Sequence, residues 1–142
     1  MKISSLRMTK QRKVILDELR KVSSHPSADE IYEMVRKRLP RISLGTVYRN
    51  LEVLTDMGEI QTLELAGTLR RYDGNPEPHY HVRCIRCDLI EDSPIVLIPD
   101  LEKNLISPAG FKILGHRLEF LGLCEKCAVG IAVKTSEKAL LL

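Results

Sequence analysis

The chain has 142 residues, of which 44% are hydrophobic and 29% are charged, and its formal net charge is +3 at pH 7. It contains no run of about eighteen apolar residues, so the sequence predicts no membrane span, and we expect a cytoplasmic protein of one domain or two small ones. The charge is uneven: residues 1–50 hold 12 Lys and Arg against 5 Asp and Glu, whereas residues 74–142 hold 8 against 9. This asymmetry favours a polyanion as the partner of the N-terminal part.

Two helices are predicted first along the chain. Thr9 is a suitable N-cap for a helix over residues 10–21, whose apolar residues recur at helical spacing. Ser27 and Glu30 match a capping box at the start of a second helix, which Pro40 ends. Both segments therefore read as amphipathic helices that bury one face.

A third helix and a hairpin follow. The helix is predicted to begin at Ser43 and to end at Gly58. Residues 59–65 and 69–72 have the composition of short strands, and residues 66–68 form the turn between them. Three short helices followed by a hairpin predict a winged helix-turn-helix, in which the third helix lies in the major groove of DNA.

The predicted module offers polar and basic side chains for double-stranded DNA. The exposed face of the third helix supplies residues that could bond phosphates or base edges. The first helix and the hairpin, which is the wing of this fold, supply phosphate contacts. The candidates are Ser43, Thr46, Tyr48, Arg49 and Asn50 on the third helix, and Lys10, Arg12, Lys13 and Arg70 elsewhere. Tyr48 and Arg49 could instead be ordinary helix surface.

All four cysteines lie in two Cys-x-x-Cys pairs, Cys84/Cys87 and Cys124/Cys127, with 36 residues between the pairs. Two such thiolate pairs complete the tetrahedral sulfur shell of a structural Zn²⁺ site. Two disulfides are the alternative. We expect zinc, because no signal peptide precedes the cysteines and a reducing cytosol disfavours disulfides.

A linker and a pair of histidines come just before the first cysteines. Residues 74–78 contain two prolines and a glycine, which break both helix and strand. On a strand over residues 79–84, His79 and His81 point to the same face and offer two nitrogen ligands for Zn, Fe, Mn or Co. Candidate partners for these histidines are Asp73, Glu91, Asp92 and the distant His25. A nitrogen and oxygen site of this kind suits Fe²⁺ or Mn²⁺, while the thiolates keep Zn²⁺.

The C-terminal part reads as a small α/β unit. Strands are predicted over residues 89–92 and 111–121, with a short helix over 99–107 between them. The unit spans about 50 residues, too few to be stable alone, so we expect it to pair with a second copy. A homodimer would also have the twofold symmetry that a palindromic operator demands.

Several of these motifs together resemble the ferric-uptake-regulator (Fur) family from about residue 8 to residue 127. The similar segments are His25-Pro26-Ser27-Ala28-Asp29-Glu30-Ile31-Tyr32, residues 43–51, Arg71-Tyr72-Asp73, His79-Tyr80-His81 and both Cys-x-x-Cys pairs. The resemblance implies an α+β protein: an N-terminal winged helix-turn-helix followed by a small α/β dimerisation domain with a four-cysteine zinc site. The expected parts are a DNA-binding domain over 1–73, a hinge over 74–78, a dimerisation and metal-binding domain over 79–127 and a tail over 128–142, either a short helix or disordered.

Within that family the chain is most similar to the peroxide-sensing PerR branch. The resemblance implies that Cys84, Cys87, Cys124 and Cys127 hold structural Zn²⁺, and that His25, Asp73, His79, His81 and Asp92 hold a regulatory Fe²⁺ or Mn²⁺ as corepressor. It also implies that peroxide reacting at iron modifies His25 or His79 and releases DNA, whereas the manganese form resists peroxide. A further metal site of some members would need ligands where this chain has Pro78 and Tyr80. We therefore expect His116 to be structural.

The sequence is also compatible with other functions. The chain could be an iron-responsive regulator of metal uptake, or a zinc-stabilised DNA-binding protein without metal sensing. A metallohydrolase could also use His-x-His with aspartates, but it would need a substrate pocket and a general base, of which the sequence gives no sign. We expect a regulator and not an enzyme.

Overall fold

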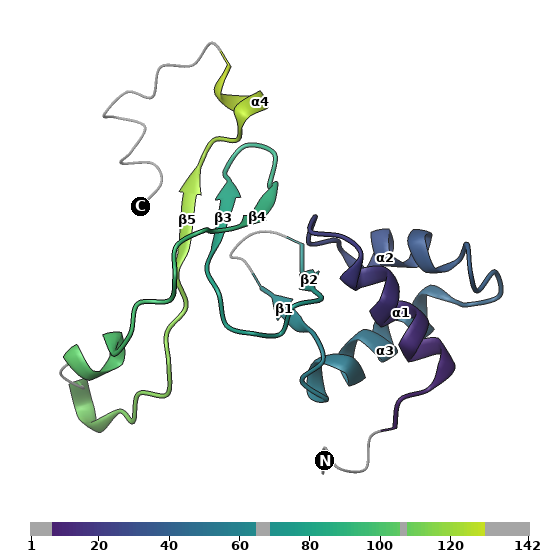
Figure 1. The fold of residues 1–142 in the computed structure, drawn as a ribbon, viewed down its shortest axis with the longest axis horizontal. Coiled ribbons are helices and arrows are strands. Elements are labelled where there is room, and N and C mark those ends of the chain that lie inside the picture. The colour runs from purple at the N-terminus through teal and green to yellow at the C-terminus, as the bar shows by residue number, and fades with distance from the viewer. Residues whose placement is uncertain (1–6, 65–68, 106–107, 130–142) are drawn as a thin grey trace. The chain divides into compact units, whose positions relative to one another are not determined.

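The computed structural model describes residues 7–64, 69–105 and 108–129, and the chain divides into two compact units, Met1–Glu77 and Pro78–Leu142. The division falls inside the predicted linker, residues 74–78 (Figure 1). None of the helices in these described ranges has the length and apolar character needed to cross a membrane.

The N-terminal unit begins with three capped helices, α1 (Lys10–Arg20), α2 (Ala28–Val35) and α3 (Leu44–Asp56). The hydroxyl of Thr9 accepts a hydrogen bond from the Arg12 amide, and Ser27 forms the capping box with Glu30. Ser43 caps α3 in the same way. Each cap satisfies a backbone N–H that the helix itself leaves without a partner, which is why the three predicted helix starts are confirmed.

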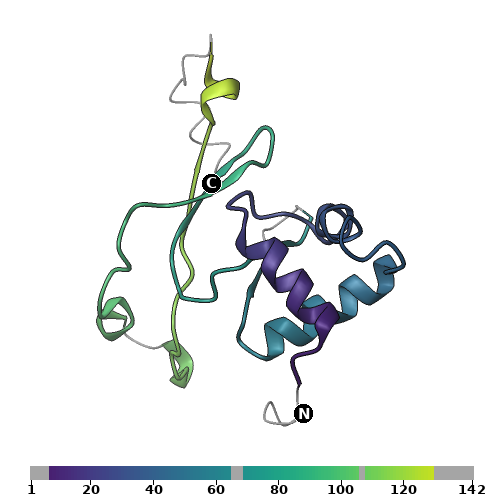
Figure 2. The same ribbon diagram turned by 45° about the vertical axis from the view of Figure 1, so that its right-hand side comes forward.

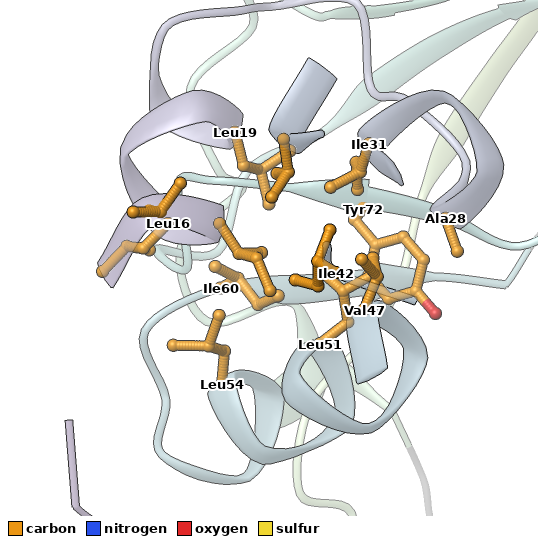
Figure 3. Packing of buried hydrophobic residues seen from close by; sticks show 13 residues of the cluster. Leu16, Leu19, Ala28, Ile31, Ile42, Val47, Leu51, Leu54, Ile60 and Tyr72 are labelled. Atoms are coloured by element: carbon orange, nitrogen blue, oxygen red, sulfur yellow. The ribbon is translucent and has the colours of Figure 1, made fainter. Parts of the chain in front are cut away.

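The three helices enclose one hydrophobic core (Figure 3). Side chains from α1, α2 and α3 meet at its centre, and Tyr72 from the hairpin closes one side. Burying each Leu, Ile or Val contributes about 1.5–3 kcal/mol. The labelled members in Figure 3 are Leu16, Leu19, Ala28, Ile31, Ile42, Val47, Leu51, Leu54, Ile60 and Tyr72.

A two-stranded antiparallel sheet completes the winged helix-turn-helix. Its strands are β1 (Gln61–Leu63) and β2 (Arg71–Asp73), with Thr62 opposite Tyr72. Both strands are shorter than predicted, and the predicted turn over residues 66–68 lies outside the described residues. β2 ends at Asp73, directly before the linker.

The C-terminal unit is built on a three-stranded sheet in the order β4-β3-β5. The strands are β3 (His81–Cys84), β4 (Ile90–Asp92) and β5 (Glu119–Gly122), and the short helix α4 (Glu125–Ala128) follows. β3 pairs antiparallel with β4 and parallel with β5. A parallel pair needs a long crossover connection. The segment between β4 and β5 provides it, leaving the sheet and returning to it (Figures 1 and 2).

Other predicted elements also differ in extent, and β3 begins at His81 and not at residue 79. The second helix ends at Val35, where the amide of Arg38 turns back onto the Val35 carbonyl. The predicted helix over 99–107 is a single 3₁₀ turn, Leu101–Asn104, because Asp100 before it has φ 58°, in the left-handed region, and residues 106–107 lie outside the described part. The predicted strand over 111–121 pairs only over Glu119–Gly122, since β3 offers no more than four residues for pairing.

The remaining predicted segment is the tail. α4 covers its first residue, Ala128, and residues 130–142 lie outside the described part of the chain.

Candidate metal centres and nucleic-acid interface

The two Cys-x-x-Cys pairs meet at one end of the C-terminal sheet. Because β3 and β5 are parallel, Cys84 at the end of β3 lies opposite Gly122 at the end of β5. The turn after β3 brings Cys87 back, and Cys124 and Cys127 follow β5 directly. The four sulfur atoms lie within 4.8 Å of one another, and those of Cys87 and Cys124 are 3.7 Å apart.

This spacing fits a closed zinc site. Four sulfurs about 2.3 Å from one Zn²⁺ at tetrahedral angles lie about 3.8 Å from one another. A disulfide would need sulfurs about 2.05 Å apart, and all four cysteines are free thiols. The geometry therefore favours the predicted zinc site over two disulfides.

The pKa values of two of the thiols are shifted in opposite directions. Burial opposes ionisation of Cys84, yet backbone hydrogen bonds, the strongest from Cys124, lower the pKa of Cys84 to about 6. The hydrogen bond with the Cys124 side chain raises the pKa of Cys127 to about 12. One sulfur thus ionises readily while a neighbour retains its proton. A bound divalent cation replaces these protons, because metal ligation requires thiolates.

The β3/β4 hairpin places two histidines beside one carboxylate. His81 lies opposite Asp92 in the antiparallel register, and His79 stands two residues earlier. The Nε2 atoms of His79 and His81 lie 3.0 Å and 3.4 Å from the same Oδ1 of Asp92, and the two ring centroids are 4.4 Å apart. Glu91 lies opposite Val82, which points to the other face. The hairpin register thus selects Asp92 and not Glu91 as the carboxylate beside the histidines.

The N-terminal unit holds a second histidine and carboxylate pair. The Nε2 atom of His25 lies 3.2 Å from Oδ2 of Asp73, whose Oδ1 accepts a hydrogen bond from the Asn75 amide at 2.9 Å. The loop that carries His25 is fixed to β2, because the Pro26 carbonyl accepts a hydrogen bond from the Tyr72 amide at 3.0 Å. His25 itself has φ 53°, a left-handed conformation that is uncommon outside glycine but tolerated by His, Asn and Asp.

Both sets of donor atoms have the spacing and chemistry of metal ligands. Two ligands about 2.1 Å from one divalent ion and at right angles lie about 3.0 Å apart, close to the measured N···O separations in each unit. Hydrogen bonds between imidazole and carboxylate have similar lengths. Imidazole nitrogen together with carboxylate oxygen suits Fe²⁺ and Mn²⁺ better than a soft metal.

His116 has a different set of partners. Its Nε2 lies 2.5 Å from the Tyr80 hydroxyl and its Nδ1 lies 2.6 Å from a Glu102 oxygen. The Tyr80 hydroxyl also accepts a hydrogen bond from the Ile98 amide at 3.0 Å. Both ring nitrogens of His116 therefore have protein partners, as expected for a structural histidine. The sequence offered no signal for this chain of contacts, because its members lie far apart along the chain.

Most of the predicted DNA-contacting residues lie on the surface of the N-terminal unit. Lys10 and Lys13 are exposed on α1, and Tyr48 and Arg49 are exposed on α3. Arg70 is exposed and forms an ion pair of 2.6 Å with Glu64. The negative charge of Glu64 raises the pKa of Arg70 further above its usual value.

The prediction that Asn50 lies on the exposed face is wrong. Asn50 is only 7% exposed, and its Oδ1 accepts a hydrogen bond of 3.1 Å from Nε of Arg12. Arg12 also donates to the carbonyl of Arg7. Asn50 thus links α3 to α1, and it faces the protein because it lies three residues after Val47 and four before Leu54, both on the buried side of α3.

Sequence reasoning also missed how the linker is held to the N-terminal unit. Arg20 from the end of α1 donates to the Gly74 carbonyl at 3.4 Å and pairs with Glu59 at 2.9 Å. The side-chain amide of Gln61 donates from Nε2 to the Asn75 carbonyl at 2.8 Å and to the Glu77 carbonyl at 3.3 Å. No local pattern signals these contacts, since donor and acceptor are 14 residues or more apart in all four cases.

Comparisons with known proteins agree with this arrangement. The model of the ferric uptake regulator family matches residues 3–121. The peroxide-responsive repressor PerR of Staphylococcus epidermidis is 35% identical over 124 residues, which cover 87% of this chain and 83% of that protein. Two solved structures are also similar. The Helicobacter pylori ferric uptake regulator, described as having three functional metal-binding sites, has a TM-score of 0.69 at 26% identity and covers 87% of this chain and 83% of its own. The Campylobacter jejuni peroxide stress regulator has a TM-score of 0.64 at 30% identity, and the match covers 82% of this chain and 88% of that protein.

Proposed function

The chain belongs to the ferric uptake regulator family of metal-responsive, DNA-binding transcription regulators, and from that premise we propose that it is a PerR-type peroxide-sensing repressor with Fe²⁺ or Mn²⁺ as corepressor. The observation that carries the proposal is the presence of a histidine and carboxylate set on each side of the linker. His25 with Asp73 precedes it, and His79 and His81 with Asp92 follow it. Similarity to peroxide-responsive repressors at 35% identity supports the choice of signal.

In this proposal one cation binds all five side chains and fixes the angle between the two units. Each unit contributes ligands whose positions its own fold already holds: the Tyr72 to Pro26 hydrogen bond secures the His25 loop, and the β3/β4 register secures Asp92. A ligand set that is ordered in advance loses little conformational freedom when it binds. Fixing the angle couples metal binding to DNA binding, and such coupling typically amounts to about 1–3 kcal/mol.

The four cysteines have a separate, structural role in the proposal. Cys84, Cys87, Cys124 and Cys127 bind Zn²⁺ and tie the ends of β3 and β5 together. Cys84 and Cys87 also lie at the turn between β3 and β4. By holding this turn, the zinc site would keep the β3/β4 register, in which Asp92 lies opposite His81.

The proposed DNA partner is a palindromic operator in the cytoplasm, bound by a homodimer through α3 and the wing. The C-terminal unit exposes large apolar side chains, including Val96 at 84%, Phe111 at 67% and Leu114 at 88%. Exposed apolar surface of this kind is typical of protein interfaces. We assign it to contact with a second copy, which aligns two recognition helices with two half-sites.

Bound Fe²⁺ would supply the redox chemistry that reduces peroxide. The role of the protein is to hold His25 and His79 beside the metal, so that one of the two imidazole rings gains one oxygen atom of peroxide. The second oxygen atom of peroxide leaves as water. An oxidised ring is a poorer ligand, so the two units lose their fixed angle and the dimer releases DNA.

The test uses the full chain with zinc bound. The protein is loaded with either Fe²⁺ or Mn²⁺ under anaerobic conditions. An operator is first selected from a random duplex pool by the manganese form. Micromolar peroxide is then added, and intact mass and operator binding are measured together. We expect the iron form to gain one oxygen on His25 or His79 and to lose operator binding, and the manganese form to keep both mass and binding.

Two other outcomes identify the alternatives. Iron-dependent operator binding without any mass change would indicate an iron-responsive regulator of metal uptake, a function favoured by the similarity to the Helicobacter pylori regulator. Operator binding that ignores both metals would indicate a zinc-stabilised DNA-binding protein whose histidines have no sensing role.

A further inference from the structure

A chain of hydrogen bonds links three side chains on the exposed side of the first turns of α3. The hydroxyl oxygens of Ser43 and Thr46 lie 2.8 Å apart, and the Ser43 hydroxyl also accepts a hydrogen bond of 3.1 Å from the Thr46 amide. Arg49, one turn further along, donates from Nη2 to the Thr46 hydroxyl at 3.1 Å. Thr46 is thus the middle member, and it contacts both the cap of the helix and the guanidinium of Arg49.

The donors and acceptors of this chain can be counted. Either Thr46 donates its hydroxyl proton to Ser43, or Ser43 donates to Thr46. In both cases the other hydroxyl keeps one proton for an outside acceptor. Arg49 has five N–H donors and no acceptor, and one N–H is directed at Thr46. The group therefore presents mainly donors to solvent.

A surface dominated by donors fits a partner with paired acceptors. In the major groove, guanine presents O6 and N7 as two adjacent acceptors, and arginine is the side chain that binds both at once. A free arginine on a helix surface samples many rotamers and loses that freedom on binding. A hydrogen bond that the guanidinium donates to the Thr46 hydroxyl holds it in place and reduces this loss. The position of the guanidinium above the helix is consistent with such a hold, since a Cβ on residue 45, which is glycine, would lie 3.5 Å from Arg49 Nη1.

We propose that Thr46 is a positioning residue for operator specificity: its hydroxyl holds the Arg49 guanidinium for donation to O6 and N7 of a guanine in each half-site. The inference rests on the proposed DNA-binding function and adds to it the base that is recognised. Thr46 acts through Arg49, so its loss weakens discrimination at one base pair and leaves the rest of the interface unchanged.

The test combines protein variants with modified operators. Manganese-loaded full-length protein first selects an operator from a random duplex pool. Binding is then measured to that operator and to versions in which each guanine in turn is replaced by 7-deazaguanine, which lacks the N7 acceptor. The variants are Thr46→Val, which keeps the side-chain shape but loses the hydroxyl, Thr46→Ser, which restores a hydroxyl, and Arg49→Ala. The matched control is Thr55→Val, which removes a hydroxyl near the far end of α3, where Thr55 bonds the Leu51 carbonyl.

The wild-type protein is expected to lose about ten- to 150-fold in affinity when one specific guanine is replaced, because one of the two hydrogen bonds from the charged Arg49 is lost while O6 still accepts the other. Arg49→Ala abolishes that penalty. Thr46→Val binds the unmodified operator about three- to tenfold more weakly and shows a smaller penalty at the same guanine, a fraction of the full contact. Thr46→Ser and Thr55→Val keep the wild-type penalty, and thermal melting verifies that each variant is folded.

The inference is overturned if Thr46→Val keeps both the wild-type affinity and the wild-type penalty, or if no guanine replacement affects the wild type. An equal loss on every operator, modified or not, would also overturn it, because a purely structural role predicts that result. Failure of the manganese-loaded wild type to select any sequence would instead contradict the proposed function itself.

Discussion

At the scale of single residues, Asn50 shows how a polar side chain on the recognition helix can serve the fold. Its buried amide accepts from Arg12, which lies 38 residues earlier in the chain. We expect Asn50→Ala to destabilise the N-terminal unit by about 1.5 kcal/mol, the low end for a hydrogen bond to a charged group, because this bond is only partly buried. For a domain of this size the melting temperature would fall by about 6–12 °C.

Thermal unfolding followed by circular dichroism measures this effect. The matched control is Glu52→Ala, which removes an exposed side chain from the same helix and should change stability by less than about 0.5 kcal/mol. An Asn50→Ala variant as stable as the control would contradict a structural role for the amide.

His25 combines a proposed ligand with an unusual backbone conformation. Its φ of 53° lies in the left-handed region, which asparagine also tolerates, so His25→Asn removes the imidazole without adding backbone strain. We expect this variant to fold and to keep its zinc, but to lose most of the gain in DNA affinity that Mn²⁺ produces, about five- to 150-fold for coupling of this kind. DNA binding measured with and without Mn²⁺ reports the gain.

His116→Asn is the matched control for His25→Asn. The imidazole of His116 bonds Tyr80 and Glu102, so we expect its loss to affect stability and to leave the Mn²⁺ response unchanged. If His25→Asn kept the full Mn²⁺ response, one of the five proposed ligands would have to be abandoned.

At the scale of elements, Tyr80 links strand β3 to the crossover segment between β4 and β5. Its ring is 2% exposed, and its hydroxyl contacts both the Ile98 amide and His116. Tyr80→Phe keeps the ring but leaves both partners without this contact, which costs about 1–3 kcal/mol where the groups stay buried. Hydrogen exchange should accelerate in the crossover, above all at the Ile98 amide.

Tyr48→Phe provides the comparison for Tyr80→Phe. Tyr48 is 43% exposed, so removal of its hydroxyl should change hydrogen exchange and stability little. Equal protection of the Ile98 amide in wild type and Tyr80→Phe would show that the crossover is held by other contacts.

The same elements show what a sequence can and cannot predict. The starts of α1, α2 and α3 were predicted to within a residue, because Thr9, Ser27 and Ser43 act on amides only three positions away. The cysteine cluster followed from residue type and spacing alone. The extent of β5 could not be predicted, because it depends on the four residues of β3 with which it pairs, and the burial of Asn50 depends on an arginine in another helix.

The candidate metal ligands were likewise predictable from local spacing but not from strand pairing. Spacing identified His79 and His81 as a pair but left Asp92 and Glu91 as equal candidates. The antiparallel register distinguishes them, since it places Asp92 opposite His81 and turns Glu91 to the other face. Register is a property of two paired strands, and no single segment of sequence contains it.

At the scale of the whole molecule, the two units differ in what stabilises them. The N-terminal unit has a continuous hydrophobic core between three helices (Figure 3). Among the described residues of the C-terminal unit, the buried hydrophobic side chains are only Tyr80, Cys84 and Ile90. A core this small supplies little stability, which supports the proposal that zinc and a second copy contribute the rest.

Removal of zinc should therefore affect the two units unequally. Zinc binding in small metal-stabilised domains is worth about 10–16 kcal/mol, as much as the whole stability of a typical domain. We expect a strong chelator under reducing conditions to unfold the C-terminal unit and to dissociate the dimer, while α1, α2 and α3 remain folded. Two-dimensional NMR reports each unit separately, and sedimentation reports the oligomeric state. Returning Zn²⁺ should restore both, whereas a zinc-free protein that stayed dimeric with a folded C-terminal sheet would show that apolar contacts between the two copies suffice without the metal.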